Sequence, residues 1–466
     1  MLRAHFLGCL GTAEPRKATL NWEELGYHAR DLNALEAPFL MEELKKAIFD
    51  MPREKAPGPD GFIGLFFRSC WDTISEDLLA AITQLSERGD GGASLLNSAN
   101  IVLIPKKPDA EVVGDFRPIS LIHSVSKLLS KMMASRIAPL LSDLVSASQS
   151  AFIKKRCIHD NFLHVQTSLR ELYRDKTPSF FIKLDISKVF DSVNWAYLTE
   201  LLGVLGFGPR WIRWVCLLLS TASSQILLNG KPGPSIRHAR GLRQGDPLSP
   251  MLFILAIDPL HHILRRATET GTLQPLGDTP VRFHVSLYAD DATVFVGPDK
   301  EDLKAITKIL EVFGDATGLK TNLTKTEIYP IRCEENQIAE ALTCFPARRG
   351  SFPCSYLGLP LHYARLKATN FQPLIDKIGA RLAGWRGKHF TRAGRVILAR
   401  SVLSSMVTYY LTISILPKWV LKRIDKIRRG FIWMKGAPTR EPQVTLLSTG
   451  ALFAGRPGWE GLGWRT

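Results

Sequence analysis

The sequence predicts a protein of the α+β class. Segments with helical periodicity and segments with strand character are intermixed along the chain, without the regular alternation of a parallel doubly wound sheet. Two short hydrophobic runs, 283–287 and 292–296, flank the residues Tyr288, Ala289, Asp290 and Asp291 and predict a hairpin. The chain has 466 residues, 45% hydrophobic and 22% charged, which is enough for several subdomains with a substantial core.

The other expected elements follow in chain order. Residues 1–37 are polar and lack strong periodicity, which predicts a linker-like segment. The cluster 56–61 (APGPDG) is rich in turn-forming residues and separates two helical patterns. Periodicity and run length predict helices over 41–51, 64–84, 119–141 and 302–317, strands over 99–105 and 180–186, and a mostly helical region over 371–434.

The charge of the chain favours a polyanionic partner. Lys and Arg outnumber Asp and Glu by 60 to 44, a net charge of +16, which suits nucleic acid. The longest apolar runs, such as 402–416, contain Ser, Thr and Tyr and are too short to span a bilayer, so we expect no membrane partner. The start lacks a signal-peptide pattern, which predicts an intracellular protein. Seven cysteines without a Cys-x-x-Cys pair argue against a disulfide framework and a structural zinc site.

Two acidic segments are candidates for metal chemistry. Asp290 and Asp291 are adjacent at the hairpin bend, where paired carboxylates are costly unless a cation neutralises them. Asp185 lies at the end of an apolar strand, where a carboxylate can meet a ligand. A two-metal site needs carboxylates from different elements around ions roughly 3.5 to 4 Å apart, and oxygen ligands suit magnesium. The alternatives are a solvated turn at the hairpin and a structural acid at Asp185.

Nine short motifs then occur in order along the chain. They are APGPDGF (56–62), IPKK (104–107), DFRPIS (115–120), QSAF (149–152) with IHDN (158–161), KLDISKVFDSV (183–193), GLRQGDPLSP (241–250), YADD (288–291), GLKTNLTKTE (318–327) and YLGLP (356–360). Together they resemble the reverse transcriptase region of LINE-type, non-LTR retrotransposons, most closely the plant elements. One such motif would not suffice, but nine in sequence order are highly specific.

The resemblance implies a right-hand polymerase with an antiparallel-sheet palm, mixed fingers and a helical thumb. The implied function is an RNA-directed DNA polymerase that extends a DNA primer on an RNA template with dNTPs. It would use two Mg²⁺ ions, with Mn²⁺ as a substitute, and work in the nucleus, with the cytoplasm as the alternative. The implied boundaries are 1–37 for the linker, 38–180 for the fingers, 181–361 for the palm with interleaved fingers elements, 362–436 for the thumb and 437–466 for a truncated or frame-shifted tail.

The resemblance also implies the metal ligands. Asp185, Asp290 and Asp291 would be the catalytic carboxylates, and the backbone carbonyl of Ile186 would be an additional ligand. One ion would lower the pKa of the primer 3′-hydroxyl, and the other would hold the triphosphate and stabilise the departing pyrophosphate.

Six further residues match nucleotide-binding positions of the family: Lys106, Arg117, Phe190, Gln244, Gly245 and Lys325. The two fingers cations, Lys106 and Arg117, would offset charge on the triphosphate, although surface cations are usually just solvated. The ring of Phe190 would exclude a ribose 2′-hydroxyl and so select deoxynucleotides; the alternative is a core phenylalanine.

Gln244 and Gly245 would lie against the incoming base and template, with a plain helix-capping turn as the alternative. The Pro247 and Pro250 that follow favour the start of a helix. Lys325 matches a position proposed as general acid for pyrophosphate, and an exposed lysine at the end of a loop is the alternative.

The predicted thumb has an unusual charge bias. Between Lys377 and Arg400 there are seven Lys or Arg residues and no acid, which favours contact with the phosphates of a template and primer duplex over a merely solvated face. The nucleic-acid-binding candidates are Arg381, Arg386, Lys388, Arg392 and Arg395.

Some features depart from the family pattern. Val189 occupies a position that is usually Ala, and its larger side chain would crowd the nucleotide sugar and lower activity. The chain starts after the place of the family's endonuclease, and the resemblance fades from about Gly436, with no zinc knuckle or ribonuclease H domain. Two alternatives follow: a catalytically impaired retrotransposon remnant that at most binds nucleic acid, and a polymerase like a group II intron maturase.

Overall fold

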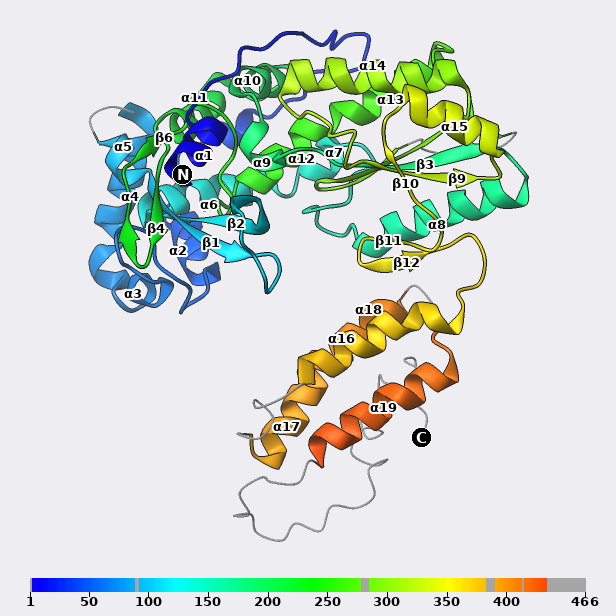
Figure 1. The fold of residues 1–466 in the computed structure, drawn as a ribbon. Helices are drawn as coiled ribbons and strands as arrows, with labels where there is room; N and C mark the ends of the chain where they lie inside the picture. Colours follow the sequence, from blue (N-terminus) through cyan, green and yellow to red (C-terminus); the bar gives the residue numbers. More distant parts are fainter. Residues whose placement is uncertain (1, 89–91, 278–284, 383–389, 413–414, 434–466) are drawn as a thin grey trace. The chain divides into compact units, whose positions relative to one another are not determined.

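The computed structural model describes residues 2–88, 92–277, 285–382, 390–412 and 415–433. The chain forms two compact units, Met1–Ser351 and Phe352–Thr466. Helices and mixed sheets occur together in the first unit, so the predicted α+β class is confirmed (Figure 1).

The N-terminal part of the first unit is mainly helical. Its elements are α1 (Leu2–Leu10), η1 (Asn33–Glu36), α2 (Met41–Asp50), α3 (Gly64–Ser69), α4 (Trp71–Arg88) and α5 (Ala93–Leu96). The helix expected over 41–51 is confirmed, whereas the one expected over 64–84 is divided at Cys70.

Residues 2–10 correct the expectation of a linker-like segment over 1–37. They form α1, whose Phe6 and Leu10 are buried against Ile101, Ile226 and Ile236. The apolar partners lie about a hundred residues or more away in sequence, and α1 shows little amphipathic pattern of its own. The local sequence of α1 therefore does not indicate that this helix is buried.

The first sheet contains β1 (Ser98–Pro105), β2 (Phe116–Ile122), β4 (Ser223–Leu228), β5 (Lys231–Pro232) and β6 (Ile236–Arg237). Strand β1 pairs antiparallel with β2 and parallel with β4. The strand expected over 99–105 is confirmed, but the helix expected over 119–141 is wrong at its start. Residues 116–122 form β2, because β1 supplies ladder partners along its whole length and Pro118 biases Arg117 towards an extended backbone.

The second sheet has the order β10-β9-β3-β8-β7. Its strands are β3 (Ser179–Leu184), β7 (Val285–Tyr288), β8 (Asp291–Val296), β9 (Glu327–Ile331) and β10 (Arg348–Arg349). Strand β8 pairs antiparallel with β3 and β7, which confirms the expected strand and hairpin; residues 283 and 284 lie outside the described ranges. In Figure 1, α8 (Ile158–Arg174) lies on one face of this sheet and α13 (Pro259–Glu269) and α14 (Lys300–Thr317) on the other.

The remaining helices of the first unit surround the two sheets. They are η2 (Val113–Asp115), α6 (Ser124–Ile137), α7 (Leu141–Leu144), α9 (Val189–Ser192), α10 (Trp195–Val204), α11 (Pro209–Ser220), α12 (Ser249–Ile257) and α15 (Glu335–Cys344). Helix α14 confirms the helix expected over 302–317. It ends at Gly318, whose φ of +85° and contact with the Ser192 carbonyl leave no room for a side chain.

The second unit is mostly helical over its described residues, as expected. A short hairpin precedes the helices, and the Tyr409 hydroxyl donates to the Leu357 carbonyl in the turn of this hairpin at 2.5 Å. The elements are β11 (Cys354–Tyr356), β12 (Leu359–Leu361), η3 (Ala368–Phe371), α16 (Gln372–Leu382), α17 (Arg392–Leu398), the π-helical turn η5 (Ala399–Leu403), α18 (Ser404–Leu411) and α19 (Lys418–Ile432). Across the described ranges, no helix is both long and apolar enough to cross a membrane.

Candidate active site

The three predicted catalytic acids lie together at one end of the neighbouring strands β3, β8 and β7 of the second sheet. Asp185 directly follows β3, Asp290 lies in the turn between β7 and β8, and Asp291 begins β8. Since Leu184 pairs with Ala292, extending this antiparallel register by one residue places Asp185 opposite Asp291. Asp290 and Asp291 are exposed, and Asp185 is half-buried. The fold therefore brings together carboxylates that are about a hundred residues apart in sequence.

The hairpin turn is held by a buried glutamine that the sequence reasoning noted only as part of a motif. Ala289 has a φ of +52°, which is unfavourable for a residue with a side chain. The side-chain oxygen of Gln149 accepts hydrogen bonds from the backbone N–H of Ala289 at 3.2 Å and of Ala151 at 2.9 Å. Gln149 is fully buried, so this contact fixes the turn that carries Asp290.

Asn161 supports the same hairpin from α8. Its side-chain amide donates to the Leu287 carbonyl at 2.7 Å, to the Ser286 hydroxyl at 3.0 Å and to the Ser148 carbonyl at 3.1 Å. These contacts join β7 to the segment that carries Gln149. The outer edge of the hairpin is thus covered by the chain rather than exposed.

A second loop holds the end of β3. The Asp185 backbone N–H donates to the Thr326 hydroxyl at 3.2 Å, and its carbonyl accepts from the Asn322 N–H at 2.7 Å. Ile186 forms an isolated antiparallel bridge with Thr321, in which the flanking residues make the hydrogen bonds, so the Ile186 carbonyl is not used in this bridge. Lys325 is exposed in the same loop, where it is accessible to a ligand.

The neighbouring carboxylates of Asp290 and Asp291 repel each other. Partial loss of hydration and the negative charge of Asp290 raise the pKa of Asp291. The nearby Lys183 lowers this pKa and offsets only part of the rise. The Lys183 ammonium itself pairs with Glu327 at 3.0 Å. Within the described residues, no ion pair or side-chain hydrogen bond neutralises the carboxylates of Asp185, Asp290 or Asp291.

These oxygens fit a divalent cation in chemical type. Three acids without a protein counter-charge, beside a backbone carbonyl, are the hard ligands that magnesium prefers. The described ranges contain no group of three or more His, Cys, Asp and Glu side chains that converges as a preformed metal site. The three acids therefore lie at the same end of adjacent strands, but their side chains do not converge on one point in this arrangement.

Phe190 belongs to α9 and contacts the loop that follows β6. Its ring packs on Phe253 of α12 with centroids 4.9 Å apart, and its carbonyl accepts from the Leu242 N–H at 2.6 Å. Phe190 is half-buried, and its neighbour Val189 is buried in the core. The ring is thus held from one side by the core while part of it remains accessible.

Gln244 and Gly245 contact strand β2 through backbone atoms. The Gln244 carbonyl accepts from the Ser120 N–H at 2.8 Å. Gly245 has a φ of +112°, and a side-chain carbon there would lie 2.7 Å from the Ser120 carbonyl oxygen, so a glycine is required. Helix α12 begins at Ser249, as Pro247 and Pro250 predict.

Lys106 and Arg117, the two cations predicted to bind nucleotide, lie near one end of the β1–β2 ladder. Arg117 is exposed on β2 opposite Ile104, and within the described residues its guanidinium has no hydrogen bond or ion pair. The Lys106 ammonium donates to the Gly114 carbonyl at 2.8 Å. Both side chains are exposed, and Arg117 is the one of the two without a hydrogen bond to another described residue.

The predicted nucleic-acid-binding residues of the second unit differ in accessibility. Arg381 and Arg392 are exposed, and the Arg392 guanidinium lies 4.7 Å from the centre of the Trp433 ring. Arg395 is 1% exposed, so its side chain is not accessible to a phosphate in this arrangement. Arg386 and Lys388 lie outside the described residues.

A buried histidine near the Gln244 loop gives a pH prediction. His238 shares a 2.8 Å hydrogen bond with Ser224, and burial, assisted by the charge of Arg243, lowers its pKa from 6.5 to about 3. Below pH 6.5 the unfolded chain binds a proton that the folded chain does not. The contribution of His238 to stability is therefore fully present above pH 6.5 and is lost as the pH decreases towards 3, by about 2 kcal/mol at pH 5.

Urea unfolding at pH 7 and pH 5 measures this effect. The His238→Gln variant should lose about 2 kcal/mol less between the two pH values than the unmodified protein. The matched control is His28→Gln at an exposed position, which should keep the full pH dependence. An unchanged pH dependence in His238→Gln would contradict a buried neutral histidine.

Comparison with known proteins gives the family. The family model for reverse transcriptase (RNA-dependent DNA polymerase) matches residues 104–361. This range contains the three acids and every predicted nucleotide-binding residue.

Similar proteins include products of mobile elements. A 149 kDa protein of transposon TX1 from Xenopus laevis is 29% identical over 407 residues, 86% of this chain and 30% of that protein. The Pol polyprotein of retrotransposable element R2DM from Drosophila melanogaster is 25% identical over 386 residues, 81% of this chain and 35% of that protein. An uncharacterized mitochondrial protein from Arabidopsis thaliana is 44% identical over 70 residues, 15% of this chain and 57% of that protein.

The chain spans about a third of the length of the first two relatives. Their retrotransposon origin confirms the predicted resemblance to non-LTR elements, while its plant type stays a prediction. Because the family model covers more than half of the residues, the chain belongs to the reverse transcriptase (RNA-dependent DNA polymerase) family.

Proposed function

We propose that this chain extends a DNA primer on an RNA template, with dNTPs as substrates, as part of a non-LTR retrotransposon protein. The observation that carries the proposal is that Asp185, Asp290 and Asp291 lie together at one end of adjacent strands. Their carboxylates have no neutralising partner in the described part of the chain. Phosphoryl transfer requires such fixed negative oxygens for metal ions. The remnant alternative rests on the sequence departures named above, chiefly Val189, whereas the family match favours the polymerase.

Each residue has a distinct role in the proposed reaction. Asp185, Asp290, Asp291 and the Ile186 carbonyl would hold two Mg²⁺ ions, or Mn²⁺ in their place. When bound, these ions would favour the ionised 3′-hydroxyl of the primer and offset the charge of the leaving pyrophosphate.

The other residues orient the substrates. The exposed guanidinium of Arg117 would pair with the triphosphate, assisted by Lys106. The Phe190 ring would restrict the sugar, and Gln244 and Gly245 would support the base. Lys325, on the loop that holds the Asp185 backbone, would donate a proton to pyrophosphate.

We also propose the assignment of fingers to residues 38–180, palm to 181–361 and thumb to 362–436. The boundary between the two compact units lies between Ser351 and Phe352, ten residues before the proposed start of the thumb. The exposed Arg381 and Arg392 would contact duplex phosphates from the thumb. The proposed location is the nucleus.

Primer extension tests the proposal directly. Purified protein, a poly(rA) template, an oligo(dT) primer and labelled dTTP should give template-dependent incorporation with magnesium or manganese. A chelator and the omission of template are the controls, and each should remove the signal. Absence of incorporation with either metal would reject the polymerase and favour the remnant that only binds nucleic acid.

A further inference from the structure

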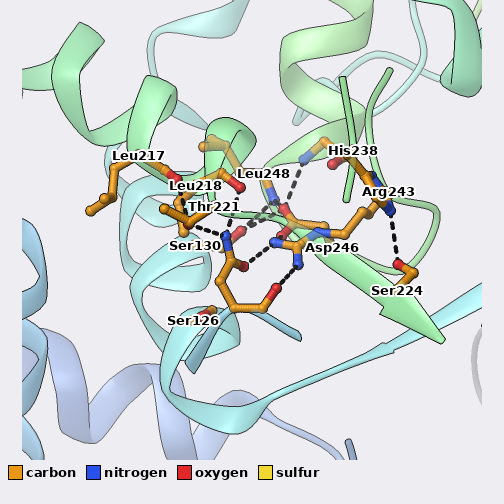
Figure 2. A network of polar contacts seen from close by, with 12 residues as sticks. Ser126, Ser130, Leu217, Leu218, Thr221, Ser224, His238, Arg243, Asp246 and Leu248 are labelled. Carbon is orange, nitrogen blue, oxygen red and sulfur yellow. Dashed lines mark hydrogen bonds and ion pairs between the residues drawn. The ribbon is translucent and has the colours of Figure 1, made fainter. Parts of the chain in front are cut away.

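A buried polar network anchors the loop that carries Gln244 and Gly245 (Figure 2). The Arg243 guanidinium donates to the Asn97 carbonyl at 3.1 Å and to the Asn97 side-chain oxygen at 2.6 Å. It also lies 3.6 Å from the carboxylate of Asp246. Arg243 and Asp246 are 7% and 6% exposed, so an ion pair flanks the two loop residues from inside the protein.

The Asp246 side of the network reaches two helices. One carboxylate oxygen of Asp246 accepts from the Ser130 hydroxyl of α6 at 2.6 Å. The same oxygen accepts from the backbone N–H groups of Leu248 at 2.8 Å and Ser249 at 3.1 Å, at the start of α12. Asp246 therefore fixes the exit of the loop at a helix N-terminus, where a negative charge is favourable.

On the other side of the network, Asn97, the residue before β1, contacts the end of α11. The Asn97 side-chain amide donates to the Leu218 carbonyl and the Thr221 hydroxyl, both at 2.8 Å. Arg243 is thus connected through Asn97 to the strand that pairs with β2. The loop is held on its inner side by this network and on its outer side by the Ser120 N–H, which donates to the Gln244 carbonyl.

A buried ion pair is an expensive way to gain stability, because desolvation offsets much of the attraction. Its better-supported use is to select one conformation among several. Here the pair borders a cavity of about 20 Å³, which has room for one water molecule. Arg243 donates one hydrogen bond to the Asn97 side chain and one to the Asn97 carbonyl. Lysine cannot reproduce this paired geometry.

We propose that Arg243 and Asp246 are positioning residues that hold Gln244 and Gly245 against β2 and thereby set the affinity for the incoming nucleotide. This inference rests on the proposed function, since it assigns the loop to nucleotide binding. Both side chains are almost fully buried, so we assign them no direct contact with the substrate. If the network is weakened, the loop should lose its hydrogen bond to Ser120 for part of the time. An incoming nucleotide must then restore the ordered loop conformation, which weakens its apparent affinity.

The test compares Asp246→Asn and Arg243→Lys with Arg136→Lys. Arg136 belongs to a separate network, with Glu43 and the carbonyls of Leu35, Ala37 and Pro38, and serves as the matched control. Asp246→Asn should raise the KM for dTTP about tenfold and change kcat by less than about threefold. Arg243→Lys keeps the charge and should show a smaller increase in KM.

Hydrogen exchange supplies a readout that is independent of catalysis. Peptides covering residues 117–121 and 241–249 should exchange faster in Asp246→Asn than in the unmodified protein, while distant peptides do not change. Arg136→Lys should lower the melting temperature without either effect. An unchanged KM together with exchange that is faster throughout the protein would overturn the proposal and leave a purely structural role.

The two proposals fail in distinguishable ways. If the unmodified protein incorporates no nucleotide, the proposed polymerase function is rejected, and the exchange measurement alone decides the positioning role. Faster exchange confined to 117–121 and 241–249 would support that role. Exchange equal to that of the Arg136→Lys control would reject it.

Discussion

Asp290→Asn is expected to abolish primer extension, with a fall in kcat on the order of 10³-fold or more. Asparagine keeps the size of the side chain but removes the negative charge at the turn between β7 and β8. The remaining acids, Asp185 and Asp291, cannot replace that charge at the same position. Single-turnover incorporation of labelled dTTP measures the rate, and fluorescence anisotropy measures the affinity for a template and primer duplex.

The duplex affinity of this variant should stay within about threefold of the unmodified protein, because phosphate contacts dominate such binding. Asp77→Asn, at an exposed position of α4, is the control and should retain full activity. If Asp290→Asn kept a tenth or more of the original rate, the assignment of the hairpin acids as metal ligands would be wrong. An unchanged circular dichroism spectrum of the variant would exclude loss of folding as the cause.

Phe190→Ala is expected to raise the use of ribonucleotides relative to deoxynucleotides by roughly 10-fold to 100-fold. The ring is half-buried against Phe253, so its position is fixed and its accessible part can oppose a 2′-hydroxyl. Removing it opens that space. The ratio of kcat/KM for UTP and dTTP on the same template measures the discrimination.

The control for this prediction is Phe207→Ala, which removes a buried ring from the same core. It should lower the melting temperature but leave the ratio for UTP and dTTP unchanged. An equal ratio in Phe190→Ala and the unmodified protein would identify Phe190 as a packing residue only. Its packing on Phe253 makes some loss of stability expected in either case.

The elements that follow directly from local pattern are those whose stabilising contacts lie close in sequence or repeat regularly. Helix α14 has a regular apolar face and ends at a glycine, and the β7–β8 hairpin consists of two short hydrophobic runs around a two-residue turn. The acids Asp290 and Asp291 are adjacent in the chain, so their proximity required no fold. Nine motifs in order were sufficient for the family, which the family model confirms.

Other features depend on partners far away in the chain. Strand β2 is extended because β1 pairs with it, although its apolar residues also suit a helix. Helix α1 is stabilised by strands about a hundred or more residues later, and Arg395, basic in a basic segment, is turned into the core of its unit. Periodicity within a window contains no information about such contacts.

The residues of this chain alone were therefore enough to indicate a reverse transcriptase and its three carboxylates. The fold was needed to show how these carboxylates are held: Asp185 meets Asp291 through strand register, Gln149 fixes the turn, and Arg243 reaches Asn97, 146 residues away. Burial determines these roles. A polar side chain looks the same in the sequence whether water or another part of the chain satisfies it, and only the packed structure distinguishes the two.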